Sequence, residues 1–265
     1  MTLDSNTLSQ KLGIESFNEL KKLLFNQLSS LFDMSIEDII YENDVIELPK
    51  PSEKYLKDNY EDVKKEGMCK LNQSTDNKIK GWRVLLSPDD KTICEKENCV
   101  KRNKNIIPSN IILRNKFDRG HLLAKMFKNY ICVDIKPYCV EHNGTGTDFF
   151  SKKNEYNIVP LFKNANEGKL DHPTQVCYEN QVYHLLDGNN QYKRKFNVYY
   201  EVQAVYANKD DEIPIGIRML YSKLENGKFQ GECVHVFVPN YYDHDDSRLI
   251  SWKDYRKIYG YRCQN

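Results

Sequence analysis

Residues with catalytic potential gather in one six-residue stretch, Phe117-Asp118-Arg119-Gly120-His121-Leu122. A histidine can accept a proton near neutral pH, an arginine can hold a phosphate group, and a glycine lets a ligand or a second backbone approach closely. Taken singly, His121 is as compatible with a structural role as with a catalytic one. Together these residues supply the groups that phosphodiester hydrolysis can use.

Three segments after His121 add further polar groups: Asn157-Ile158-Val159-Pro160, Asn166-Glu167-Gly168 and Tyr178-Glu179. Mg²⁺ prefers oxygen ligands and usually keeps several waters, so one amide carbonyl and the substrate phosphate can complete its shell. A neutral ligand such as Asn166 leaves the charge of the cation available to the transition state. The order and chemistry of these segments favour a metal-assisted nuclease, although Asn166-x-Gly168 is by itself more typical of a turn.

On these motifs the chain resembles the DNA/RNA non-specific endonucleases of the ββα-metal (His-Me finger) class, which carry a DRGH motif, an NxxP segment and a later asparagine. The resemblance covers residues 67 to 240. It implies that His121 is the general base, that Asn166 is the protein ligand of Mg²⁺, and that Glu179 supports the hydration of the ion. It also implies active-site positions for Arg119 and Asn157.

Two features depart from the family pattern. The stretch between His121 and Asn157 holds the loop 143–147 and is long for this family, which suggests a substrate-facing insertion. Pro173 interrupts the helix expected between Asn166 and Glu179, which makes the assignment of Glu179 less secure than that of His121.

Charge is uneven along a chain whose net charge is only +1. Residues 101–128 hold eight cations against Asp118 alone, at positions 101, 102, 104, 114, 116, 119, 125 and 128. Such a patch attracts a phosphate backbone, and we expect Arg114, Lys116 and Lys125, with Asp118, at the nucleic-acid interface. Residues 33–62 are acidic, with ten carboxylates against three lysines. This acidic segment either covers the basic patch, docks a partner or simply solvates the surface.

The pattern of apolar residues predicts an α+β protein. Apolar residues at three- and four-residue spacing over 12–32 predict a helical N-terminal segment, placed at 1–48, and Pro49 and Pro51 predict a linker over 49–66. Residues 67–265 are then the nuclease domain, a ββα-metal core on a mixed or antiparallel sheet. Its expected strands are 82–86, 111–113, 196–206, 218–222 and 233–240, and 118–127 should run from a strand through a loop toward a helix.

Other functional classes find little support in the sequence. Its eight cysteines lack the short spacing of common zinc sites and are expected to be free thiols. No apolar run is long enough for a membrane span. The N-terminal stretch lacks an apolar signal-peptide core, which predicts a cytoplasmic protein or one exported by a non-classical route.

The sequence therefore predicts a Mg²⁺-dependent endonuclease without strong sequence preference, in which Mn²⁺ can substitute. DNA is the expected substrate and RNA a second candidate. Similarity of the segment 199–218 to the bacterial branch of the family suggests a toxin-type effector, which would need a cognate inhibitor (immunity) protein. The alternative is a catalytically inactive nucleic-acid-binding or interaction module of the same fold.

Overall fold

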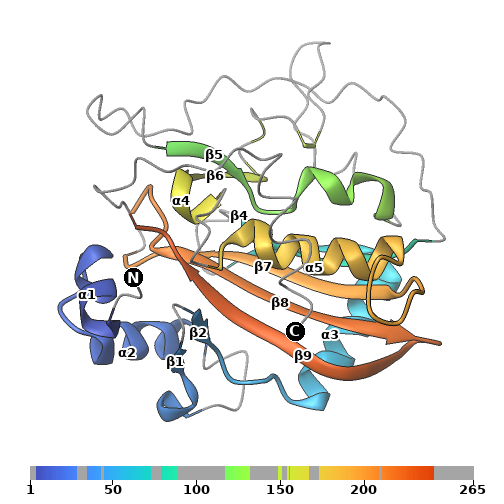
Figure 1. Ribbon diagram of the computed structural model, residues 1–265, viewed down its shortest axis with the longest axis horizontal. Coiled ribbons are helices and arrows are strands. Elements are labelled where there is room, and N and C mark those ends of the chain that lie inside the picture. Colours follow the sequence, from blue (N-terminus) through green and yellow to red (C-terminus); the bar gives the residue numbers. More distant parts are fainter. Residues whose placement is uncertain are drawn as a thin grey trace.

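The computed structural model describes residues 4–28, 35–42, 45–72, 79–88, 117–131, 149–150, 154, 156–166, 173–208 and 211–241. A seven-stranded sheet forms its centre, with the strand order β1-β2-β9-β8-β7-β4-β3 and antiparallel pairing between all neighbours (Figure 1). The strands are β1 (Ile40–Glu42), β2 (Val45–Glu47), β3 (Met68–Asn72), β4 (Ile79–Leu86), β7 (Asn197–Val205), β8 (Gly216–Glu225) and β9 (Lys228–Pro239). A second, two-stranded antiparallel sheet consists of β5 (Phe117–His121) and β6 (Ile158–Phe162). The α+β class is as predicted.

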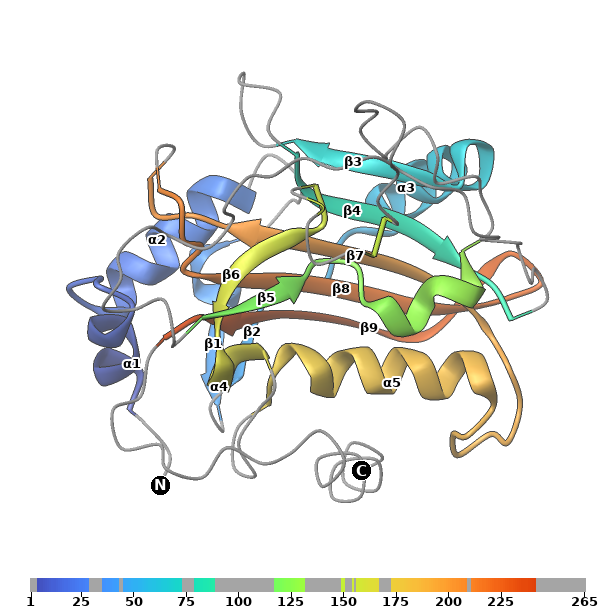
Figure 2. The ribbon, with the colours of Figure 1, turned by 90° about the horizontal axis from the view of Figure 1, so that it is seen from above.

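Helices and the small sheet cover the two faces of the large sheet (Figure 2). Helix α5 (Gln175–Asp187), the β5–β6 pair and the 3₁₀ helix η3 (Lys125–Tyr130) pack on one face, which we call the site face. Helices α1 (Ser5–Lys11), α2 (Phe17–Leu28) and α3 (Glu53–Glu66) contribute to a second apolar cluster on the other face, which we call the rear face. The remaining elements are η1 (Ile36–Asp38) and α4 (Lys163–Asn166).

Coverage of both faces explains the composition of the central strands. In β7, Val198, Tyr200 and Val202 belong to the site-face cluster, while Tyr199 and Val205 belong to the rear-face cluster. A strand buried on both faces is apolar along most of its length rather than alternating. The predicted strands at 82–86 and 218–222 lie within β4 and β8, and those at 196–206 and 233–240 lie within β7 and β9 except for a residue at their ends. The predicted strand at 111–113 lies outside the described residues.

A buried carboxylate, Glu201, lies on the rear face of β7. Its two oxygens contact the Nε of Arg83 and the Nη2 of Arg218, each at 2.8 Å, and the Tyr55 hydroxyl of α3 lies 3.0 Å from both oxygens. Burial by itself would raise the pKa of Glu201, but Arg218 and Arg83 outweigh it and lower this pKa to about 2. The charge is therefore compensated on all sides, as a buried carboxylate requires.

His235 of β9 extends this network to the N-terminal part of the chain. Its Nε2 accepts a hydrogen bond of 2.8 Å from the Nε of Arg218, and its Nδ1 donates one of 2.5 Å to the Pro49 carbonyl. Burial, aided by the charge of Arg218, lowers the pKa of His235 to about 3. The imidazole is thus held neutral, with its proton on Nδ1.

The N-terminal part of the chain differs from its prediction. Residues 1–48 contain two strands as well as helices, and β2 pairs with β9 in the large sheet. The expected linker at 49–66 is extended only up to Ser52, whose side chain caps α3 by accepting from the Tyr55 amide at 3.1 Å. Pro49, Pro51 and the charges beside them predicted a linker here, but Leu56, Tyr60 and Val63 recur at helical spacing and bury one side of α3.

The acidic segment does not cover the histidine strand. Its described residues belong to η1, β1, β2 and α3, and the buried side chains of β2 and α3 contribute to the rear-face cluster. Strands β5 and β6 pack on the site face instead. Helix α3 therefore lies across the large sheet from His121, and β1 and β2 form an edge of that sheet.

Candidate active site

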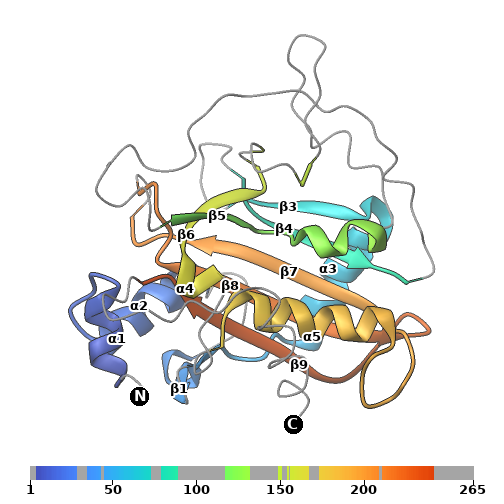
Figure 3. The same ribbon diagram turned by 45° about the horizontal axis from the view of Figure 1, so that its top comes forward.

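His121 is the last residue of β5 and pairs with Ile158 of β6. Figure 3 shows β5 and β6 side by side above the large sheet. The preceding Gly120 permits close packing at this point, because a Cβ there would lie 2.4 Å from the Cδ1 of Leu161. Phe117 and Phe162 stack at the other end of the pair, with ring centroids 4.3 Å apart. Asn240, just after β9, ties β6 to the large sheet, since its Oδ1 accepts from the Phe162 amide at 2.8 Å.

The imidazole of His121 is oriented by a backbone carbonyl. Its Nε2 lies 2.8 Å from the carbonyl oxygen of Phe150. Because a carbonyl only accepts, Nε2 must carry the proton, and the basic lone pair of the neutral ring is then on Nδ1. Phe149 anchors this carbonyl segment through an edge contact with the buried Trp82 ring, and its own carbonyl accepts from Asn154 at 2.8 Å.

Asn157 clamps the chain that leaves His121. Its Nδ2 donates to the Leu123 carbonyl at 3.0 Å and its Oδ1 accepts from the Leu123 amide at 2.7 Å. Its backbone carbonyl accepts from the Leu122 amide at 2.8 Å. The side chain is fully buried, so the geometry gives this predicted site residue a positioning role.

Glu179 is connected to His121 through Gln175, one helical turn earlier on α5. The Nε2 of Gln175 donates to the Oε1 of Glu179 at 2.7 Å and to the His121 carbonyl at 2.5 Å. Both side chains are buried, and burial raises the pKa of Glu179 to about 8. At neutral pH this carboxyl group is mostly protonated unless a cation stabilises its charged form.

Asn166, at the end of α4, contacts the same strand that carries His121. Its Nδ2 lies 3.4 Å from the Oδ2 of Asp118, which the sequence had assigned to the nucleic-acid interface. Asp118 is three residues before His121, about 10 Å along an extended strand. Pro173 precedes α5 as expected, since α4 ends at Asn166 and α5 begins at Gln175.

The oxygen donors at this position fit Mg²⁺ or Mn²⁺. Asn166 offers an amide carbonyl and Asp118 a carboxylate, both hard oxygen ligands. Within the described residues, no group of three or more His, Cys, Asp or Glu side chains could hold a metal ion. A sparse donor set of this kind suits a cation that retains most of its water.

Two cations near His121 are exposed, the predicted active-site residue Arg119 and the predicted interface residue Lys125. Arg119 lies on β5 and Lys125 begins η3, and neither is within ion-pair distance of a carboxylate in the part of the chain that is described. Both can therefore contact a phosphate. Arg114, Lys116 and the loop 143–147 lie outside the described residues.

Three contributors to this geometry carried no assignment from the sequence: Gln175, Asn154 and the Phe150 carbonyl. Gln175 and Glu179 have the i, i+4 spacing that puts two side chains on one helix face, so this pair could have been found. A backbone carbonyl has no residue-type signature and could not.

Two general expectations can be compared with the described residues. Cys69, Cys177 and Cys233 are free thiols, and the other five cysteines lie outside this part of the chain. None of the described helices is long and apolar enough to cross a membrane.

Comparisons with known proteins gave structural matches alone, since no family model and no curated protein matches the chain. The magnesium-bound NucA from Streptococcus agalactiae has a TM-score of 0.47 and 16% identity, over 90% of this chain and 94% of that one. An extracellular nuclease has a TM-score of 0.41 and 12% identity, over 69% and 89%. The zinc-bound Sda1 nuclease has a TM-score of 0.42 and 12% identity, over 67% and 75%. At these values the likeness carries no argument, and the function must be inferred from the residues of this chain.

Proposed function

We propose that the chain is a metal-dependent, sequence-non-specific endonuclease that hydrolyses DNA, with RNA as a second substrate. The observation that carries the proposal is the orientation of His121, whose Nε2 contact with the Phe150 carbonyl makes Nδ1 the basic nitrogen. The succession of β5, β6 and α4, with His121 ending β5 and Asn166 ending α4, supports a ββα-metal arrangement. The nuclease domain is proposed to span 67–265, with residues 1–66 adding β1 and β2 to its sheet and helices to its rear face.

In this proposal His121 takes a proton from the attacking water through Nδ1, which typically contributes about 10²- to 10⁴-fold to the rate. The Phe150 carbonyl keeps its hydrogen bond to Nε2 and so stabilises the imidazolium that forms. Gln175 and Asn157 fix the backbone at His121 and at Leu123 just after it, and Glu179 fixes Gln175.

Arg119 and Lys125 bind the phosphate backbone of the substrate, and Asn166, with Asp118 beside it, would hold Mg²⁺ or Mn²⁺. When bound, the ion supplies positive charge that stabilises the phosphate in the transition state. Glu179 acquires the role of supporting the hydration of the ion only if the bound charge lowers its raised pKa.

The biological setting is also part of the proposal. A toxin-type effector would require a partner protein that blocks the site until release. This requirement follows from the resemblance of the sequence to the bacterial branch of the family.

Incubation of the purified protein with supercoiled plasmid and with RNA, with and without Mg²⁺ or Mn²⁺, tests the proposal. We expect metal-dependent cleavage that falls about 10²- to 10⁴-fold in His121→Ala and is partly restored by added imidazole. Asn166→Ala should need a much higher concentration of metal ion for cleavage. Asn59→Ala, on α3 at the rear face, should cleave as the wild type does. Salt-sensitive binding without cleavage would instead favour the inactive nucleic-acid-binding module.

A further inference from the structure

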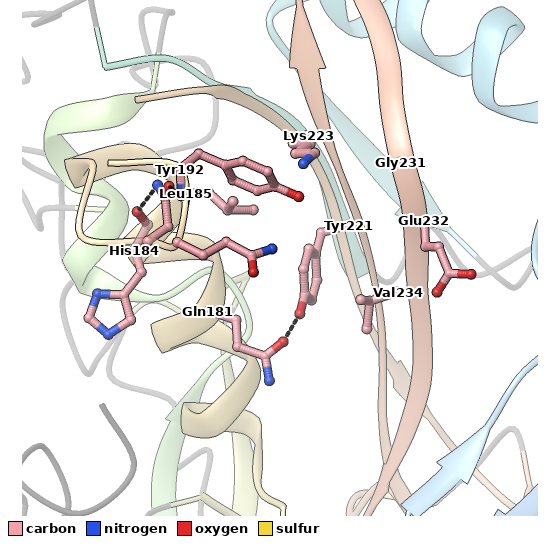
Figure 4. Close-up of a pocket in the computed structure, with 11 residues that line it drawn as sticks. Gln181, His184, Leu185, Tyr192, Tyr221, Lys223, Gly231, Glu232 and Val234 are labelled. Atoms are coloured by element: carbon pink, nitrogen blue, oxygen red, sulfur yellow. Dashed lines mark hydrogen bonds between the residues drawn. The ribbon is translucent and has the colours of Figure 1, made fainter. Parts of the chain in front are cut away.

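A pocket of about 330 Å³ lies between the C-terminal half of α5, the loop that follows it, and strands β8 and β9 (Figure 4). Its walls include the rings of Tyr192 and Tyr221, the apolar side chains of Leu185 and Val234, and the ammonium group of Lys223. The volume is near the lower end of the range for small-molecule sites, which suits a single ring rather than a large ligand.

The loop that forms one wall is held in shape by Asn190. Its Nδ2 donates to the carbonyls of His184 and Arg194, each at 2.8 Å, and its Oδ1 accepts from the Tyr192 amide at 3.0 Å. Lys193 adopts a positive φ of 51°, which is uncommon for a residue other than glycine. The loop therefore presents Tyr192 without having to be ordered by a ligand, which reduces the cost of binding.

The charge around the pocket is positive once existing ion pairs are considered. Two nearby carboxylates are already paired, Glu225 with Arg194 at 2.9 Å and Glu232 with Lys50 at 3.1 Å. Three lysines have no carboxylate within ion-pair distance in the described part of the chain: Lys193, Lys195 and Lys223. Lys223 lies 3.7 Å from the ring centroid of Tyr192, so one cation and one aromatic face share the same wall.

An aromatic wall beside lysines that have no carboxylate partner among the described residues matches the chemistry of single-stranded nucleic acid, whose bases stack on aromatic rings while its phosphates contact cations. A duplex keeps its bases stacked inside and offers no free ring to such a pocket. We propose that this pocket binds one unstacked nucleobase of a single-stranded nucleic acid, with the adjoining phosphates held by Lys193, Lys195 and Lys223. This inference rests on the proposed function, which makes nucleic acid the substrate.

Helix α5 sets the distance between this pocket and the candidate active site. Gln175 contacts the His121 carbonyl near the start of the helix, and His184 lines the pocket near its end. These positions are about 14 Å apart along the helix axis, the length of about four nucleotides at the spacing of one DNA strand. A single strand of modest length can therefore reach both.

Binding to the full-length His121→Ala protein tests the proposal without cleavage of the probe. A fluorescein-labelled 20-nucleotide oligothymidine is titrated by anisotropy at several salt concentrations, without divalent metal. We expect Tyr192→Ala to weaken binding about 5- to 150-fold, the range for one base–aromatic stack, and Tyr192→Phe to retain it within about twofold.

The lysines are tested through the salt dependence of binding. Replacing Lys193 and Lys195 by alanine should lower the slope of log affinity against log salt by about 1.4, since each lost phosphate contact of a single strand contributes about 0.7. Replacing Lys54 and Lys57 of α3 removes the same charge from the rear face and should leave the slope unchanged.

The proposal is overturned if Tyr192→Ala binds the probe as well as its His121→Ala parent, or if the two lysine pairs change the slope equally. Binding of a polyglutamate peptide with the same dependence on Tyr192 would overturn it in favour of an acidic-protein site. Cleavage by the wild type is measured in a separate assay. An inactive wild type would refute the proposed function, and the binding of the oligothymidine to the variants would still test the pocket.

Discussion

The raised pKa of Glu179 predicts an unusual dependence of stability on pH. Burial moves this pKa from 4.5 to about 8, so the folded protein holds a proton that the unfolded chain releases. The resulting stabilisation is fully present below about pH 4.5 and is lost as pH rises through 8. A difference of about 3.5 pKa units corresponds to at most about 5 kcal/mol of unfolding free energy over this window.

Glu179→Gln removes the titration and keeps an oxygen that can accept from the Nε2 of Gln175. The free energies of unfolding of wild type and variant, from urea denaturation between pH 5 and 8.5, should therefore diverge. The wild type should lose several kcal/mol relative to Glu179→Gln as pH rises. EDTA prevents a bound cation from stabilising the carboxylate, and a reductant keeps the cysteines as thiols.

Glu61→Gln is the matched control, because Glu61 is an exposed carboxylate on α3. Its difference from the wild type should stay nearly constant across the same range. If the difference for Glu179→Gln also stays constant within about 0.5 kcal/mol, the carboxyl group does not experience the desolvated environment on which this prediction depends.

Three further predictions concern positioning and the rear face. Asn157→Ala leaves both backbone groups of Leu123 without their hydrogen bonds, which costs about 1 to 3 kcal/mol each. Steady-state kinetics should show a lower kcat at nearly constant KM. An unchanged kcat would contradict the positioning role of Asn157. His235 has a pKa lowered to about 3, so its stabilising contribution is lost as pH falls from 6.5 through 3; ring-nitrogen NMR should show a neutral imidazole at pH 5. Deletion of residues 1–66 exposes the Glu201 network and should abolish cooperative thermal unfolding, whereas a more active, folded product would revive the covering hypothesis.

Long apolar strands were the most predictable part of the fold. Residues 196–206 are rich in aromatic and β-branched side chains, and β7 forms there because both of its faces are buried. Helix α3 was missed because only Leu56, Tyr60 and Val63 of its residues are buried. Its remaining side chains have the composition of a solvated linker. The helical spacing of the three apolar residues was therefore too weak a signal to predict a helix here.

The candidate site likewise has a part that could be predicted from the sequence and a part that could not. His121 and Asn166 could be proposed as site residues because their residue types and spacing suit the chemistry. The contacts of Asn157 could not be predicted, because residue type does not distinguish an asparagine that bonds to the Leu123 backbone from one that binds substrate. The contact between the Phe150 carbonyl and His121 could not be predicted either, because residue type does not encode where a distant segment of the chain packs.

Pairing between an N-terminal and a C-terminal strand of the described residues affects how the protein is made. β2 pairs with β9, and Asn240, just after β9, forms a hydrogen bond with β6, the partner strand of β5. Contacts between such distant segments form slowly, and a ribosome releases the N-terminal part first. The support for His121 is therefore incomplete until synthesis has passed residue 240. If the chain does cut nucleic acid, its nascent form should be harmless to the messenger and ribosome that produce it.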